Sequence, residues 1–212
     1  MSEPPIHPGS VVLITGIMGA GKSTVAQALA ERLPRAVHVR GDAFRRMIVS
    51  GRAEMVPRAD AEALAQLRLR YRLGATVADG YAAAGFTAVY QDIILGEDLT
   101  AVTDAIHARP LYLVVLAPRP EVVRQRADSR AKVSGYGEWT VDALDEMLRA
   151  TPRIGLWLDT SDQSADESVN AILARAAEAL INAAPEEGTL MSSTGEPKET
   201  AFGDDGGPPS GL

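Results

Sequence analysis

The chain has 212 residues, of which 46% are hydrophobic and none is cysteine; this suits one α/β domain and excludes disulfides, thiolate metal sites and a cysteine nucleophile. No apolar run approaches the ~20 residues that span a bilayer, and the first ten residues lack the pattern of a signal peptide, so we expect a cytoplasmic protein with no membrane partner. The formal net charge is -7, but six acidic residues after position 184 carry most of it, so the rest of the chain gives no electrostatic reason to expect a nucleic-acid partner.

The first predicted element is a buried strand that leads into a glycine-rich loop. Residues 1–9 are rich in proline and predict a flexible arm, and the apolar run at residues 11–15 predicts a strand of a parallel sheet. The next nine residues read GIMGAGKST and fit the phosphate-binding (Walker A) pattern GxxxxGK[ST]. The predicted nucleotide-binding residues are Gly16, Ile17, Met18, Gly19, Ala20, Gly21, Lys22, Ser23 and Thr24.

The chemistry of polyphosphate binding explains this spacing. Glycines at 16, 19 and 21 let the backbone turn tightly, so that successive N–H groups face one side. A predicted helix over residues 22–33 directs its N-terminus at the anion. Lys22 can then reach the β- and γ-phosphates, and Ser23 can offer its hydroxyl to Mg²⁺. A glycine-rich turn without a ligand is the alternative, but the strand and helix on either side favour a site for ATP or GTP.

A carboxylate follows the second predicted strand, residues 36–40. Asp42 therefore lies at the carboxyl end of a strand, where open α/β sheets form their active-site crevice. It can orient an acceptor hydroxyl and accept its proton, which is a catalytic role, or it can cap the short helix that follows. Arg45 lies on that helix, and we predict that it binds substrate together with Asp42.

A loop over residues 50–60 and a long helix over residues 61–84 precede the third predicted strand, residues 86–91. Arg68 and Arg72 are four apart on the helix and are predicted to form a solvated face. Asp92 follows the strand directly. It is either a turn residue or an acidic residue that helps to hold Mg²⁺ or substrate.

A cluster of basic residues lies after the fourth predicted strand, residues 111–116. The helix that begins near Pro118 carries Arg124, Arg126 and Arg130, and Lys132 and a Ser-Gly-Tyr-Gly segment follow it. This arrangement predicts a small lid over about residues 124–139, with Arg126 and Arg130 as catalytic cations that close over the transferring phosphate. An exposed basic helix is the alternative.

The remaining elements complete one α/β domain over residues 10–184. Helices are predicted over residues 139–150 and 165–183, and a fifth strand over residues 154–158. Five strands separated by helices predict a five-stranded parallel sheet with right-handed crossovers and helices on both faces. Residues 185–212 have no apolar period and predict a disordered acidic tail.

These features favour a kinase that acts on a small molecule. One compact domain contains every predicted site, and the NKxD sequence with which GTPase switches read their base is missing from the sequence. A regulatory protein that binds nucleotide without phosphoryl transfer is the alternative from another functional class.

The sequence resembles the chloramphenicol phosphotransferase-like family of P-loop kinases. The resemblance runs loosely from Val11 to about Ile181 through the segments VVLITGIMGAGKS, VRGDAF, QDIILG, RQRADSR and LDTS. It implies the fold of nucleoside-monophosphate and shikimate kinases, and Mg²⁺-dependent transfer of a γ-phosphate to a hydroxyl of an antibiotic or related molecule, a reaction that would confer antibiotic resistance. It also implies that Asp42 is the catalytic base and that Arg126 and Arg130 are lid arginines.

The chain departs from this family in two places. It has Gln91-Asp92 where the family often has an acidic pair, which weakens a metal role there. Residues 43–75, where the acceptor is expected to bind, match poorly, so a nucleoside-type antibiotic or a metabolite is an equally open acceptor. A toxin-like kinase of nucleotide sugars, which shares this loop and fold, is a further alternative.

Overall fold

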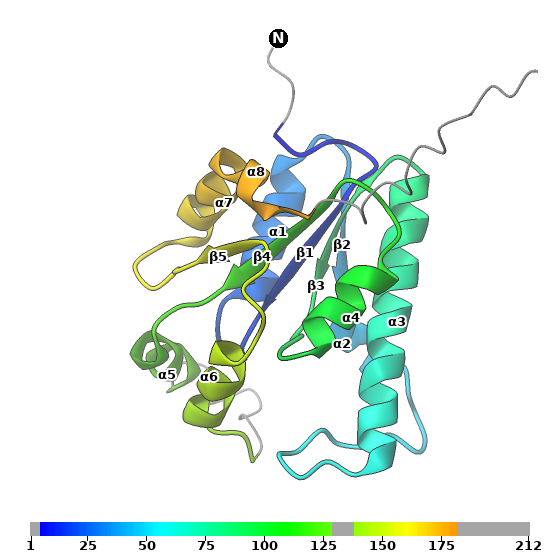
Figure 1. The fold of residues 1–212 in the computed structure, drawn as a ribbon, viewed down its shortest axis with the longest axis vertical. Coiled ribbons are helices and arrows are strands. Elements are labelled where there is room, and N and C mark those ends of the chain that lie inside the picture. The colour runs from blue at the N-terminus through cyan, green and yellow to red at the C-terminus, as the bar shows by residue number, and fades with distance from the viewer. Residues whose placement is uncertain (1–4, 129–137, 182–212) are drawn as a thin grey trace, which may run out of the picture.

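The structure is a computed structural model that describes residues 5–128 and 138–181. The predicted strand-and-helix alternation is present throughout this part of the chain (Figure 1). The elements in chain order are β1 Val11–Gly16, α1 Lys22–Arg32, β2 Ala36–Arg40, α2 Gly41–Arg46, α3 Ala61–Ala83, β3 Thr87–Gln91, α4 Asp98–Ala105, β4 Leu111–Leu116, α5 Pro120–Asp128, α6 Val141–Arg149, β5 Leu156–Leu158, α7 Ala165–Ala174, α8 Ala176–Ala179 and β6 Leu180–Ile181.

The sheet confirms the predicted five parallel strands, in the order β2-β3-β1-β4-β5. β1 lies in the centre, paired in parallel with β3 on one side and β4 on the other. All six residues of β1 and all six of β4 are buried, as expected for strands that are covered on both faces. The phosphate loop therefore leaves the carboxyl end of the most protected strand of the fold.

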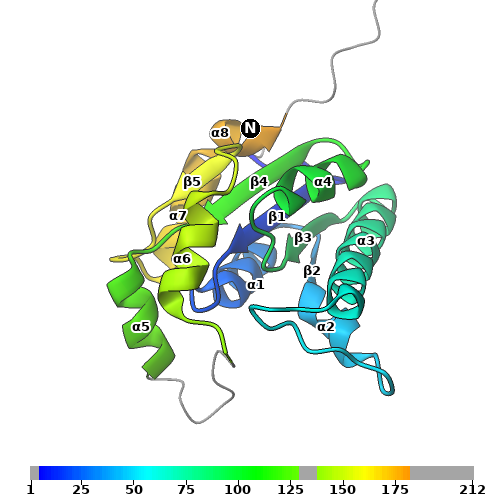
Figure 2. The same ribbon diagram turned by 60° about the horizontal axis from the view of Figure 1, so that its bottom comes forward.

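Helices cover both faces of the sheet. α1 and α7 pack together on one face, and α3 and α4 lie on the other (Figures 1 and 2). α5 and α6 pack against each other beyond the carboxyl ends of the strands, on the opposite side of this edge from α2 and the lower half of α3 (Figure 2). Helices therefore flank, on both sides, the edge of the sheet that carries the predicted site residues.

The C-terminal part of the described chain corrects one prediction. The predicted helix over residues 165–183 is interrupted at Arg175, which separates α7 from α8, and it ends at Ala179, where β6 adds an antiparallel strand to β4. The physical reason is the short β5, which pairs only with Val114–Leu116 of β4 and leaves the edge of Leu111 and Tyr112 for β6. Leu180, which the helical period directed inward, is consequently 41% exposed.

Two further differences concern segments with little apolar period of their own. Ile6 is 1% exposed and belongs to the core, so the segment predicted as a flexible arm is anchored to the domain at this residue. α4 was not predicted, although Leu99 and Val102 bury its inner face. The predicted disordered tail lies outside the described residues, and none of the described helices is long and apolar enough to cross a membrane.

Candidate active site

Three glycines of the phosphate loop, Gly16, Gly19 and Gly21, have positive φ angles. Gly16 has a φ of 141°, and a Cβ built on it would overlap the carbonyl oxygen of Leu116 on the neighbouring strand. Gly21 has a φ of 96° and immediately precedes α1. Side chains rarely adopt this region. The glycines thus let the chain reverse between β1 and α1, the kind of turn from which backbone N–H groups can face an anion.

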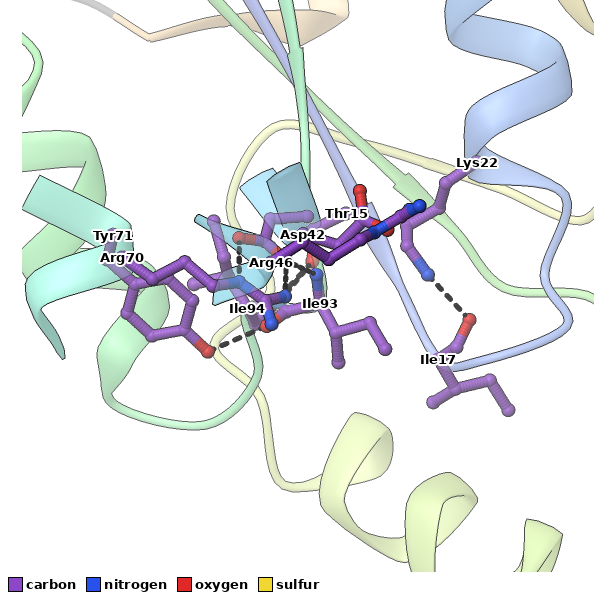
Figure 3. Close-up of polar contacts among 10 residues, drawn as sticks. Thr15, Ile17, Lys22, Asp42, Arg46, Arg70, Tyr71, Ile93 and Ile94 are labelled. Carbon is purple, nitrogen blue, oxygen red and sulfur yellow. Dashed lines mark hydrogen bonds and ion pairs between the residues drawn. The ribbon is translucent and has the colours of Figure 1, made fainter. Parts of the chain in front are cut away.

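Lys22 lies inside this loop. Its side chain is largely buried, with the residue 8% exposed, and its Nζ donates a hydrogen bond of 2.9 Å to the carbonyl oxygen of Ile17 (Figure 3). Ser23 and Thr24 are exposed at the start of α1. A cationic Nζ beside turning amides and an accessible serine hydroxyl are groups that fit a triphosphate and its Mg²⁺.

The loop is also tied to the segment after β3. The Thr15 hydroxyl donates to the carbonyl oxygen of Ile94 at 2.7 Å and accepts from its N–H at 2.9 Å (Figure 3). Both bonds are buried. They hold the ends of the neighbouring strands β1 and β3 in one fixed arrangement.

Asp92, at the end of β3, forms a buried ion pair with Arg70 of α3. Its side chain is 1% exposed, and one oxygen accepts from Arg70 Nε at 2.7 Å while the other accepts from Arg70 Nη2. The Ile93 N–H also donates to this carboxylate at 2.7 Å. Both oxygens therefore have partners, whereas the sequence had suggested a turn residue or a ligand of metal or substrate.

The sequence pattern did not distinguish Arg70 from the other arginines of this helix. Arg68 and Arg72 are exposed on the outer surface of α3, as predicted. Arg70 lies three residues after Leu67 and four before Gly74, which packs on Tyr90 of the sheet. That helical spacing is the feature that would have placed Arg70 beside the strand ends. Burial lowers the pKa of its guanidinium, which nevertheless stays cationic.

The turn between β2 and α2 lies directly against Asp92. Gly41 has no side chain to interpose, and a Cβ built on it would overlap the Asp92 carboxylate. The next residue is Asp42. The ion pair between Arg70 and Asp92 thus supports the backbone that carries the predicted catalytic carboxylate.

This packing gives a prediction for stability. Gly41→Ala is expected to lower the free energy of unfolding by about 1–3 kcal/mol, because the added methyl group overpacks a buried site. Gly80→Ala is the matched control, since nothing lies within 4 Å of a Cβ there and alanine favours a helix by about 0.5–1 kcal/mol. Urea unfolding of both variants measures the difference. Equal stability of the two variants would contradict the close approach of Gly41 and Asp92.

Asp42 itself is accessible. Its side chain is 44% exposed and forms an ion pair with Arg46 four residues later (Figure 3). α2 begins one residue before it, with Arg40 at the N-cap and no side-chain capping bond, so the capping role is not the one that this structure shows. Arg45 pairs with Glu54 across the following loop.

Arg126 lies next to the phosphate loop, whereas Arg124 does not share its surroundings. Arg126 of α5 donates from Nη2 to the carbonyl oxygen of Thr160 at 2.8 Å. It borders a cavity of about 210 Å³ that also touches Gly21 and Thr24. Arg124 instead pairs with the exposed Asp142 of α6. Arg130 and Lys132, predicted for the lid, lie outside the described residues.

A model of the AAA domain family matches residues 11–154. The chain belongs to the AAA domain family. No curated protein matches the sequence. The comparison does not name the chloramphenicol phosphotransferase-like family, so that resemblance remains a prediction.

Solved structures with a similar fold include several kinases. An APS kinase of Mycobacterium tuberculosis, solved with AMPPNP and APS, has a TM-score of 0.61 and 21% identity over 80% of this chain and 98% of its own. A sugar kinase from Janibacter sp. has a TM-score of 0.57 and 20% identity, over 81% and 96%. A gluconokinase from Sinorhizobium meliloti has a TM-score of 0.53 and 20% identity, over 80% and 92%. At these identities the likeness establishes a shared P-loop kinase fold.

Proposed function

We propose that the protein is an NTP-dependent phosphotransferase that moves a γ-phosphate to a hydroxyl of a small molecule. The observation that carries this proposal is the phosphate loop with its buried Lys22, beside two strand ends that carry Asp42 and Asp92. In a kinase an acceptor hydroxyl must be oriented beside the γ-phosphate, and the exposed carboxylate of Asp42 can do this.

Each predicted site residue has its own role in this reaction. Main-chain N–H groups of residues 16–24 and Lys22 bind the triphosphate, and Ser23 would hold Mg²⁺, which neutralises the phosphates when bound. Asp42 orients the acceptor hydroxyl and takes its proton. The cavity beside Arg126, lined with Thr24, Thr160 and Gln163 among others, also touches Gly21 of the phosphate loop, so it has room for part of the nucleotide next to that loop.

The acceptor that the resemblance favours is an antibiotic, whose phosphorylation would protect the cell. Transfer of labelled γ-phosphate from ATP and from GTP to a panel of antibiotics, nucleoside antibiotics, nucleotide sugars and simple polyols tests both the reaction and its acceptor class. Label on a nucleotide sugar alone would favour the toxin-like alternative. Slow hydrolysis that no acceptor accelerates would favour the regulatory alternative and contradict the proposal.

Arg126→Ala is expected to lower kcat by about 10²–10³-fold, by analogy with the loss of one oxyanion donor, and to weaken nucleotide binding less. Its guanidinium borders the loop without belonging to it, so we expect it to act mainly on charge that develops during transfer. Arg124→Ala is the matched control, because its partner Asp142 is an exposed residue of α6. Steady-state kinetics with nucleotide titrations measure both variants. Unchanged kcat in Arg126→Ala would mean that α5 is only a basic surface helix.

A further inference from the structure

A small apolar pocket lies between α2 and α3, beneath the loop that joins them. Its cavity volume is about 50 Å³. Most of its walls are aliphatic or aromatic, and the apolar residues that matter here are Phe44, Ile48, Ala53, Leu67, Leu69 and Leu73. The neighbouring structures named above include enzymes of sugars and gluconate, whose acceptors are polar, and an aliphatic lining does not suit such acceptors.

Specific contacts hold the loop between α2 and α3, which covers this pocket. Gln66 of α3 donates to the carbonyl oxygen of Gly51 at 2.8 Å and accepts from the Ala53 N–H at 2.9 Å. Arg45 forms its ion pair with Glu54 beside these bonds. Trp139, which precedes α6, donates from Nε1 to the carbonyl oxygen of Met55 at 3.0 Å. These contacts fix the position of the loop that covers the pocket.

The polar residues of the pocket lie near the predicted catalytic residue, Asp42. Arg45 and Arg70 both line the pocket. Asp42 lies three residues before Arg45 on α2, and Gly41, the residue before Asp42, lies directly against the Asp92 carboxylate. Arg70 is in turn fixed by Asp92 at the end of β3. An acceptor with its apolar part in the pocket would thus have its polar part beside the ion-paired Arg45 and Arg70, on the side of α2 where Asp42 precedes Arg45.

We infer that the pocket selects an alcohol with a short apolar group, which it binds with the hydroxyl toward Asp42. This inference rests on the proposed phosphotransferase function, because it names the acceptor class of that site. A volume of 50 Å³ holds about four water-sized groups at 10–15 Å³ each. The bound apolar group is therefore about four carbons long, and further carbons extend to the surface.

A series of 1,2-alkanediols with rising chain length, compared with glycerol and gluconate, tests the inference as phosphate acceptors. Each added CH₂ is expected to raise kcat/KM by about two- to fourfold, since burying it is worth up to ~0.8 kcal/mol. The rise should continue to 1,2-hexanediol, whose tail has four carbons, and level off at 1,2-octanediol. Equal kcat/KM for glycerol and all the diols, or a preference for gluconate, would overturn the inference.

Two matched variants test whether the pocket causes the dependence of kcat/KM on chain length. Leu69 and Leu180 are 40% and 41% exposed, but only Leu69 lines the pocket. Leu69→Gln should remove most of the dependence on chain length, and Leu180→Gln should keep it. If Leu180→Gln loses the dependence equally, the pocket is not its origin.

Fluorescence separates failure of the pocket from failure of the enzyme. Trp157→Phe leaves Trp139 as the single tryptophan, because the sequence has two, and Trp139 is bonded to Met55 of the pocket. If no diol is phosphorylated but Trp139 reports tighter binding with each carbon up to hexanediol, the pocket inference stands and the proposed reaction fails. If polar acceptors are phosphorylated and the diols neither bind nor react, the reaction stands and the pocket inference fails.

Discussion

Lys22→Ala is expected to abolish phosphoryl transfer and to weaken triphosphate binding by about 2–5 kcal/mol, the usual cost of truncating one partner of a desolvated charge pair. The residue is 8% exposed and its Nζ rests on the carbonyl oxygen of Ile17. A point charge held in this way meets the β- and γ-phosphates with little reorganisation. Transfer of labelled phosphate and calorimetric nucleotide titration measure the two losses.

The control for this variant must separate charge from packing. Lys22→Met keeps the length and the buried stem of the side chain but removes the ammonium group. It is expected to fold like the parent, with an unchanged circular dichroism spectrum, and to lose activity as Lys22→Ala does. Near-normal turnover in either variant would contradict the assignment of residues 16–24 to a nucleotide site.

Much of the fold could be predicted because its strands are short, buried and separated by helical patterns. The run at residues 11–15 and the run at residues 111–116 are apolar throughout, and both became central strands. The phosphate loop could be predicted for a different reason. Its glycines meet a backbone requirement that is local, so nothing distant in the chain had to be known.

The features that were missed depend on distant partners. β6 exists because β5 is too short to cover the whole edge of β4, and no local pattern in residues 180–181 indicates this. Ile6 is buried because it packs on the rest of the domain, and the sequence around it has no apolar periodicity that would predict this burial. Arg70 looked like one of several helix arginines until α3 was placed beside the strand ends, where Asp92 binds it.

Asp42→Asn is expected to reduce kcat by about 10²–10⁴-fold, the usual contribution of a general base, while nucleotide affinity changes little. Asparagine keeps the size of the side chain and its reach to the acceptor, but it loses the negative charge and cannot take the proton. Proton removal is late in a loose transition state, so part of the loss reflects weaker orientation of the hydroxyl. Folding should survive, because Asp42 is 44% exposed and caps no helix.

Arg46→Ala is the control for Asp42→Asn, because it separates loss of the ion pair from loss of the carboxylate. In the structure Arg46 is the ion-pair partner of Asp42, so Asp42→Asn also weakens that pair, and Arg46→Ala removes the pair while leaving the carboxylate. An exposed i,i+4 pair contributes only about 0.3–0.5 kcal/mol, so Arg46→Ala should keep kcat within a few fold of the parent. Parental turnover in Asp42→Asn, measured with a confirmed acceptor, would mean that Asp42 has no catalytic role. The catalytic carboxylate would then be sought elsewhere, with Asp92, whose oxygens accept from Arg70 and the Ile93 N–H, as the next candidate.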